Sequence, residues 1–464
     1  MRTGRRPAGR QRGRLRPLRL ALTGLLVVTA GAGCTLLAAD AEPDGPTPVR
    51  PELPVPAAPE PAAGVPVLRP VDGGRDFYDR FTPALRTDDH FFPVGVWFES
   101  VLDVEDVQRD RAAGINLYVE LTEDSDLDLV RSAGMTAILG QPRGGVETVG
   151  WLVSDEADMW GGPGSGAWTG HYPGQGEICL DPGERCGFTI QESNLRDLPG
   201  DARLRFANYG KGVTFWWDDA TAARFVNEFQ DVVSADNYWF TDEYICGPTE
   251  GGVLVGADVR LDPEDCHLAA NYGRTVDRVR GLVQPAGSKP VWGFVELGHP
   301  SSEENWPTIT PAEVRGAVWS SLIHGARGII YFNHSFGGDC QSQHVLREPC
   351  YAATRETVTR LNHQIARLAP VLNAPFADGV TTVAGAVDTM TRLYDGRLYV
   401  VAGSAQPGPQ AAAFRLSCVD DATVTVLDED RTVELTSGSF TDEFADGNAV
   451  HVYRIDGPDT CGLG

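Results

Sequence analysis

The chain has 464 residues, of which 42% are hydrophobic and 22% charged, so it is long enough for a large folded domain with an appendage. Its formal net charge is −25, from 39 basic and 64 acidic residues. Without the eight arginines of residues 1–33, the basic count falls from 39 to 31 and the charge to −33. Such an acidic surface excludes nucleic acids and other polyanions as partners and favours neutral or cationic ones.

Residues 1–33 are typical of an export signal, with arginines and no acid followed by the apolar run Leu20–Gly33. That run is too short to span a bilayer comfortably. It ends at Gly31-Ala32-Gly33-Cys34, which resembles a bacterial lipobox with Gly31 in place of the usual leucine. We therefore expect Cys34 to carry a lipid that anchors an extracellular protein to the cell membrane.

Nine cysteines are present, and the eight besides Cys34 form an even set. Most lie in close pairs, and no CxxC occurs, so in an exported protein disulfides are favoured over metal sites or free buried thiols. No HExxH motif is present either, and we expect no metal and no cofactor. The expected disulfides are Cys179–Cys186, Cys246–Cys266, Cys340–Cys350 and Cys418–Cys461.

Residues 34–75 are rich in proline, alanine and glutamate and predict an extended tether. From Phe91, apolar runs alternate with amphipathic segments, the pattern of a parallel sheet covered by helices. The expected strands are Pro93–Phe98, Ile115–Leu121, Met135–Gly140, Gly150–Ser154, Leu204–Ala207, Val232–Asp236, Val291–Val295 and Gly328–Phe332. The expected helices are Val104–Ala113, Leu127–Ala133, Ala220–Gln230, Leu268–Val283, Pro311–His324 and Arg355–Leu368.

Two connections depart from a regular alternation of strands and helices. Residues 141–149 are too few for a crossover helix, whereas a long glycine-rich loop runs from Ala157 to about Thr189. After Pro375 the apolar segments become short and alternating, which predicts antiparallel strands. These are Val383–Ala386, Thr391–Leu393, Arg397–Ala402, Ala411–Leu416, Ala422–Val426, Arg431–Leu435 and Val450–Ile455. We therefore expect a (β/α)8 TIM barrel over residues 76–375 and a small β-sandwich over residues 376–464.

Two glutamates follow buried strands far apart in the sequence. Glu156 follows the fourth expected strand and Glu296 the seventh. In a barrel, both side chains would lie at the mouth formed by the carboxyl ends of the strands. Glycoside hydrolysis needs such a pair, one carboxylic acid to protonate the leaving oxygen and one carboxylate to attack or to activate water. Asp242 and Glu243, after the sixth strand, are the main competing acids.

The stretches Phe92–Trp97, Gly316–Trp319 and Gly325–Phe332, together with the two strand-end glutamates, resemble the clan of retaining glycoside hydrolases built on (β/α)8 barrels. The resemblance implies that Glu156 is the acid/base and Glu296 the nucleophile. The clan usually has asparagine before the acid/base, where this chain has Asp155. Asp155 could contact a sugar hydroxyl or keep Glu156 protonated by repulsion.

Tyr238 lies where the clan often keeps a tyrosine that donates to the nucleophile, although a core aromatic would look the same. Tryptophans near predicted strand ends could stack on sugar rings. Histidines that line a cleft could contribute polar contacts. The tryptophans at or beyond these ends are Trp97, Trp160, Trp168, Trp216, Trp217, Trp239, Trp292 and Trp306. The histidines are His299, His334 and His344. The substrate-binding candidates are Asp155, Trp97, Asn208, Tyr238, Trp292, His299 and Asn333.

These features together predict an extracellular, membrane-tethered, monomeric glycosidase. We expect it to cleave a neutral oligo- or polysaccharide by a two-glutamate retaining mechanism. The alternative is a glycan-binding lipoprotein that keeps the barrel but has lost catalysis. Asp155 favours that alternative, whereas the presence of both Glu156 and Glu296 favours the enzyme.

Overall fold

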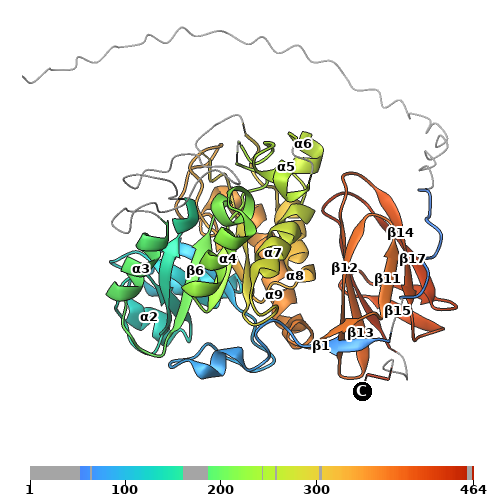
Figure 1. Cartoon of the computed structure of the whole chain (residues 1–464), viewed down its shortest axis with the longest axis horizontal. Helices are drawn as coiled ribbons and strands as arrows, with labels where there is room; N and C mark the ends of the chain where they lie inside the picture. Colours follow the sequence, from blue (N-terminus) through green and yellow to red (C-terminus); the bar gives the residue numbers. More distant parts are fainter. Residues whose placement is uncertain are drawn as a thin grey trace, which may run out of the picture. The chain divides into compact units, whose positions relative to one another are not determined.

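The computed structural model describes residues 53–62, 65–159, 187–242, 244–256, 259–301, 306–456 and 462–463. All of them belong to one compact unit, residues 52–464. Within it lie a closed parallel barrel and a C-terminal region of antiparallel sheets (Figure 1). The fold is a TIM barrel followed by a β-sandwich, as the alternation of apolar segments predicts.

Eight parallel strands close the barrel in chain order, each paired with its sequence neighbours and the last with the first. They are β2 (Val94–Glu99), β3 (Leu117–Leu121), β4 (Thr136–Leu139), β5 (Thr148–Asp155), β6 (Leu204–Tyr209), β7 (Val232–Ala235), β8 (Val291–Glu296) and β9 (Ile329–Phe332). Each overlaps one of the eight strands expected from the sequence. Glu156 and Glu296 therefore do mark the ends of the fourth and seventh barrel strands.

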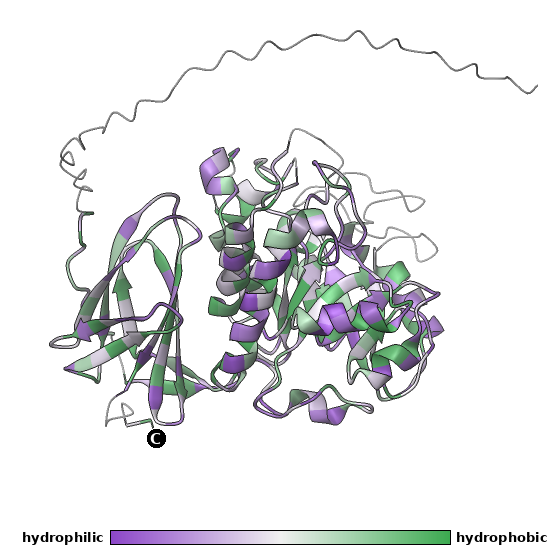
Figure 2. Cartoon of the chain, turned by 180° about the vertical axis from the view of Figure 1, so that it is seen from behind, coloured by the Kyte–Doolittle hydropathy of each residue, from purple (hydrophilic) through white to green (hydrophobic). Residues whose placement is uncertain are grey.

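Helices surround the barrel, and their hydrophobic positions alternate with hydrophilic ones (Figure 2). They are α1 (Val104–Ala112), α2 (Leu127–Ser132), α3 (Gly187–Asp197), α4 (Asp219–Glu228), α5 (Gly251–Leu254), α6 (Pro263–Cys266), α7 (Ala270–Leu282), α8 (Pro311–Ile323) and α9 (Ala352–Leu372). Short helical turns occur at η1 (Phe77–Arg80), η2 (Ala157–Met159), η3 (Gly212–Trp216) and η4 (Pro349–Tyr351). Thr310 and Glu313 form a capping box before α8, where an N-cap followed by proline was expected.

Alternate strand residues fill the barrel interior, and this alternation decides which side chains reach the mouth. One buried cluster contains inward residues from all eight strands, among them Leu152, Phe206, Val232 and Phe294. The residues between them, such as Val153 and Val295, pack in a second cluster with the helices. Glu296 lies two positions beyond Phe294, so its side chain also points into the barrel, at the carboxyl end of the strand.

The sandwich contains two antiparallel sheets, one ordered β1-β10-β12-β13-β18-β15-β16 and one ordered β11-β14-β17. Their strands are β1 (Val67–Arg69), β10 (Phe376–Asp378), β11 (Thr381–Ala384), β12 (Val387–Tyr394), β13 (Arg397–Ser404), β14 (Gln410–Leu416), β15 (Ala422–Val426), β16 (Arg431–Leu435), β17 (Ser439–Phe444) and β18 (Val450–Ile455). Strand β1 comes from the expected tether, residues 34–75, and pairs with β10. The expectation of an extended tether is therefore wrong for Val67–Arg69, because these residues form the edge strand of the larger sandwich sheet.

Two of the expected disulfides, Cys246–Cys266 and Cys340–Cys350, are formed. Cys418 is also disulfide-bonded, while Cys179, Cys186, Cys461 and the proposed lipid site Cys34 lie outside the described residues. Within the described part of the chain, no helix is both long and apolar enough to cross a membrane.

Candidate active site

Three residues other than glycine adopt left-handed backbone conformations at the carboxyl ends of barrel strands. They are Phe98, Glu120 and Glu156, with φ angles of 48°, 61° and 47°. Side chains with a Cβ rarely adopt this region, and such strain concentrates at functional sites, where it re-aims side chains. The ends of the first, second and fourth strands therefore mark the barrel mouth as the candidate site.

Glu156 lies against the loop that follows β6. A Cβ at Gly210 would be only 3.2 Å from Glu156 Oε1, so glycine leaves room for the carboxyl group. Burial, followed by the charges of Asp155 and Asp158, raises the pKa of Glu156 to about 8, against an opposing attraction from Lys211. A carboxyl group with this pKa keeps its proton at neutral pH, as a general acid must.

Glu296 is fully buried and accepts hydrogen bonds from three groups. Its Oε1 accepts from the backbone N–H of Phe240 at 2.9 Å and from the Tyr272 hydroxyl, and its Oε2 accepts from the Thr241 hydroxyl. Burial raises the pKa of Glu296 to about 7, although the bonds from Thr241 and Tyr272 favour the ionised form. The three donors fix this carboxylate and support its charge.

One loop, residues 236–242 after β7, connects the surroundings of the two glutamates. It supplies Phe240 and Thr241 to Glu296, and its Asp242 raises the pKa of both Glu156 and Glu296. Lys211 binds Asp242 at 2.7 Å and Glu250 at 2.8 Å, so its charge is already paired. The charge of Asp242 therefore acts on both glutamates, while Phe240 and Thr241 of the same loop bind Glu296.

Two further aspartates lie at the carboxyl ends of β5 and β7, the strands on either side of β6. Asn208, at the end of β6, donates to Asp155 Oδ1 at 3.0 Å and accepts from Ser234 at 2.6 Å. Asp236 follows β7, and its Oδ2 accepts from the Tyr238 hydroxyl at 3.2 Å. Burial, followed by the charges of Glu156 and Asp155, raises the pKa of Asp236, and the Asn208 amide opposes this rise. Burial raises the pKa of Asp155 to about 6, although the residue as a whole retains exposed surface.

Aromatic side chains from β2, β9 and their loops form a continuous wall. His334 lies 5.9 Å from Phe98 and 6.0 Å from Phe336, measured between ring centroids. Phe332 then connects His334, at 5.1 Å, to Tyr238, also at 5.1 Å. Phe98 and Phe336 are each 43% exposed, so this wall offers aromatic surface to solvent. Such faces suit the apolar side of a sugar ring.

Four of the predicted substrate-binding residues are not available for that role. Trp97 is 6% exposed and packs edge-on against Phe294, and Trp292 is 1% exposed and donates to Tyr78, because strand parity places both in the barrel interior. His299 is fully buried against Thr308. Asn333 is equally buried, donates to Glu99 and accepts from Leu346 N–H. These predictions were wrong because the strand-end positions face the core.

Tyr238 also differs from its expected role, since it donates to Asp236, while Tyr272 donates to Glu296. Asn208 is fully buried and donates to Asp155, so it is a residue that orients Asp155 rather than one that is exposed to a ligand. The tryptophans Trp216, Trp217 and Trp239 are core residues, Trp306 is half-buried, and Trp160 and Trp168 lie outside the described residues, as does Glu243.

The predicted cleft histidines belong to polar networks of their own. His334 bonds the Phe98 carbonyl at 3.0 Å, and His344 bonds the fully buried Glu99, which also contacts Arg347 at 3.3 Å. Sequence reasoning missed Glu120, Asp236, Lys211, Phe98 and Phe336. The period-2 alternation could have identified Asp236, two positions beyond the inward Ser234. No signal in the sequence indicated the exposed phenylalanines.

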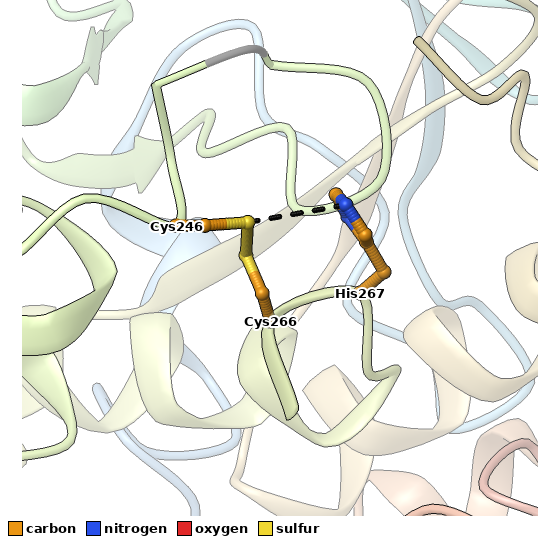
Figure 3. Close-up of side chains that lie close together, drawn as sticks. All are labelled: Cys246, Cys266 and His267. Atoms are coloured by element: carbon orange, nitrogen blue, oxygen red, sulfur yellow. Dashed lines mark hydrogen bonds between the residues drawn. A yellow bond between two sulfur atoms is a disulfide. The ribbon is translucent and has the colours of Figure 1, made fainter. Parts of the chain in front are cut away.

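Cys246, Cys266 and His267 are the one group of three potential metal ligands among the described residues (Figure 3). The two cysteines are disulfide-bonded with a Cα–Cα distance of 5.4 Å, so no thiolate is left to bind a metal. His267 Nε2 lies 3.9 Å from Cys246 Sγ, and its Nδ1 bonds the Trp239 carbonyl at 2.7 Å. This cluster therefore braces the loop that carries Phe240 and Thr241 to Glu296.

No protein-family model matches the sequence, and no curated protein matches it. Solved structures with a similar fold include a glycoside hydrolase, with a TM-score of 0.48 and 11% identity over 80% of this chain and 94% of that one. An α-amylase from Geobacillus thermoleovorans, complexed with acarbose, has a TM-score of 0.47 and 10% identity over 81% and 100% of the two chains. A glycoside hydrolase family 5 protein from Bacteroides vulgatus has a TM-score of 0.46 and 10% identity over 80% of this chain and 91% of that one. These similarities assign no activity, and the barrel is defined by this chain's own strand pairing.

Proposed function

We propose that the chain is a retaining glycoside hydrolase with Glu156 as general acid/base and Glu296 as nucleophile. The observation that carries the proposal is that the two glutamates lie at the carboxyl ends of the fourth and seventh strands of one closed barrel, where the charge of Asp242 acts on both. Burial raises the pKa of both groups, to about 8 for Glu156 and about 7 for Glu296. Their other neighbours act in opposite directions, because the charges of Asp155 and Asp158 favour the protonated form of Glu156, whereas three hydrogen-bond donors favour the ionised form of Glu296.

The chemistry follows from these environments. Glu156 gives its proton to the glycosidic oxygen while a Glu296 oxygen forms a bond to the anomeric carbon and the leaving group departs. Glu156, now ionised, removes a proton from water, which displaces Glu296 and regenerates both groups. The Tyr272 hydroxyl and the Phe240 N–H hold Oε1 throughout, so Oε2 is the attacking oxygen. The mechanism requires no cofactor.

Because Glu296 and the Thr241 side chain that donates to its Oε2 are both fully buried, substrate reaches this oxygen only if the loop carrying Thr241 moves. Asp155 is the competing nucleophile, since it is exposed and is oriented by Asn208. Glu296 is preferred because it has three donors rather than one to support its charge. The two assignments predict different sites of covalent labelling.

The aromatic wall around His334 supports a carbohydrate substrate, and the net charge of −25 disfavours an anionic one. We place the enzyme outside the cell, tethered as a monomer through a lipid on Cys34 and the segment that follows it. Support for this localisation comes from the apolar run before Cys34 alone. A catalytically inactive glycan-binding lipoprotein is the second candidate, favoured by the complete burial of Glu296.

The test uses a panel of aryl-glycosides that differ in sugar and anomeric configuration, with purified wild type, Glu156→Gln and Glu296→Gln. Glu296→Gln should lose turnover on every substrate. Glu156→Gln should retain activity on substrates with very good leaving groups, since these need no proton. Asp197→Asn, an exposed change on α3, is the control and should match wild type. Hydrolysis at the wild-type rate by both glutamate variants would exclude this site, and glycan binding without turnover would favour the second candidate.

A further inference from the structure

The carboxyl groups at the barrel mouth outnumber the cations that face them. Among the described residues no ion pair involves Asp155, Glu156 or Asp236. The nearest cation, Lys211, attracts Glu156 but is bonded to Asp242 and Glu250. Arg143 attracts Glu120, yet its guanidinium donates to the carbonyls of Leu121 and Thr122. Among the described residues, Asp155, Glu156 and Asp236 therefore have no cation of their own, so each of them must hold a proton, keep its charge in contact with water or meet a cation from outside the protein.

One of these groups has a vacant acceptor that is already buried. Asp236 is 8% exposed, and its Oδ1 has no hydrogen-bond partner, while its Oδ2 accepts from Tyr238. Strand parity directs Asp236 into the barrel, since Ser234, two positions earlier, bonds the inward Asn208. An unpartnered buried carboxylate oxygen is costly unless a ligand or a proton satisfies it.

From this geometry, and resting on the proposed glycosidase function, we propose that the mouth binds a primary ammonium group of the substrate between Asp155 and Asp236. The substrate class is accordingly an amino sugar with a free amine. Asp155 offers the exposed carboxylate and Asp236 the vacant buried oxygen. This proposal replaces the expectation of a neutral polysaccharide with that of a cationic one.

Two observations favour an ammonium group over a metal ion. No three carboxylate oxygens of the described residues lie within 4.8 Å of one another, so a divalent ion would lack its coordination shell here. An ammonium group needs only a few acceptors and carries three donors. The net charge of −25 also attracts polycations from a distance.

When no ammonium group is bound, protons on Asp155 and Asp236 take its place. Burial raises the pKa of Asp155 to about 6, and burial followed by the charges of Glu156 and Asp155 raises the pKa of Asp236. An ammonium ion between them favours the ionised carboxylates, so its binding should release protons. This release separates recognition of the amine from stacking on the aromatic wall, which moves no proton.

The test is calorimetric titration of wild type with three β-1,4-linked oligomers, of glucosamine, N-acetylglucosamine and glucose, at pH 6 in two buffers of different ionisation heat. The glucosamine oligomer should bind at least tenfold more tightly than the others and release protons. Asp236→Asn and, separately, Asp155→Asn should abolish that preference, whereas Asp197→Asn should keep it. The exposed position of Asp155 makes its variant informative even when Asp236→Asn does not fold.

Equal affinity for the three oligomers, or no binding of the amine, overturns the proposal. Binding of the amine without hydrolysis of any glycoside would refute the glycosidase function and leave this inference intact. Hydrolysis of neutral glycosides with no preference for amines would support the glycosidase function and refute this inference.

Discussion

Replacing Glu156 by glutamine should stabilise the protein at alkaline pH while removing activity. In the folded chain the pKa of Glu156 is about 8, compared with an ordinary value of 4.5. Between these values the folded state binds more protons than the unfolded state, so stability is lost as the pH rises from about 4.5 to 8. Glutamine has the same shape and carries no charge, so the variant escapes this loss.

The interval from 4.5 to about 8 corresponds to at most about 5 kcal/mol at roughly 1.4 kcal/mol per pH unit. Because Glu156 is half-buried and water can relax around it, we expect about half of this value. The free energy of unfolding of Glu156→Gln should therefore exceed that of wild type by about 2–3 kcal/mol at pH 9. For a folded unit of this size, that is a rise in melting temperature of about 3 °C. Below pH 4.5 the two proteins should be equally stable.

Thermal or urea unfolding of wild type and Glu156→Gln from pH 4 to pH 9 measures this difference, with aryl-glycoside turnover measured on the same preparations. Asp197→Asn serves as the control, because its exposed carboxyl should give no pH-dependent gain. A variant that is less stable than wild type at pH 9, or a gap that does not widen with pH, would refute the reasoning about Glu156.

Further outcomes follow from the same structure. Phe98→Ala should raise KM severalfold with little change in stability, because its ring is 43% exposed; an unchanged KM would remove it from the sugar-binding wall. Replacing Cys246 and Cys266 by serine should cost about 2–4 kcal/mol and lower kcat by loosening the loop that holds Glu296, as unfolding and steady-state kinetics would show. Cys34→Ser should release the protein from cells into the medium, and an unchanged membrane-bound fraction would count against lipidation.

The hydrophobic pattern predicted most of the fold, because a buried parallel strand is a continuous apolar run whatever its surroundings. Helix α3 was missed, since only Gly187, Phe188 and Gln191 of its residues are buried and its apolar period is weak. Strand β17 was missed because its sequence alternates Phe440 and Phe444 with charged residues, and Asp442 packs as an ion-pair partner of Arg431. In both segments tertiary contacts outweigh local pattern.

The site was predicted less completely than the fold. The two glutamates could be placed by counting strands, but the donors to Glu296 come from Thr241 and Tyr272, which no motif connects to it. Trp292 was misjudged because it lies near the amino end of β8, away from the mouth, where it bonds Tyr78. Asn333 was misjudged because the sequence does not show that its amide bonds Glu99 and Leu346. Asp236, by contrast, could have been predicted, because it lies two positions beyond the inward-facing Ser234 in the sequence.

The most direct measurement of the central claim is covalent trapping. A panel of 5-fluoroglycosyl fluorides keeps the other ring substituents, including an amine, and slows hydrolysis of the glycosyl-enzyme formed in a retaining mechanism. Mass spectrometry of the digested, inactivated protein should find one sugar on the peptide containing Glu296, and none when Glu296 is replaced by glutamine. A label on Asp155 instead, or turnover of these reagents with no covalent adduct, would contradict the assignment of Glu296 as the nucleophile.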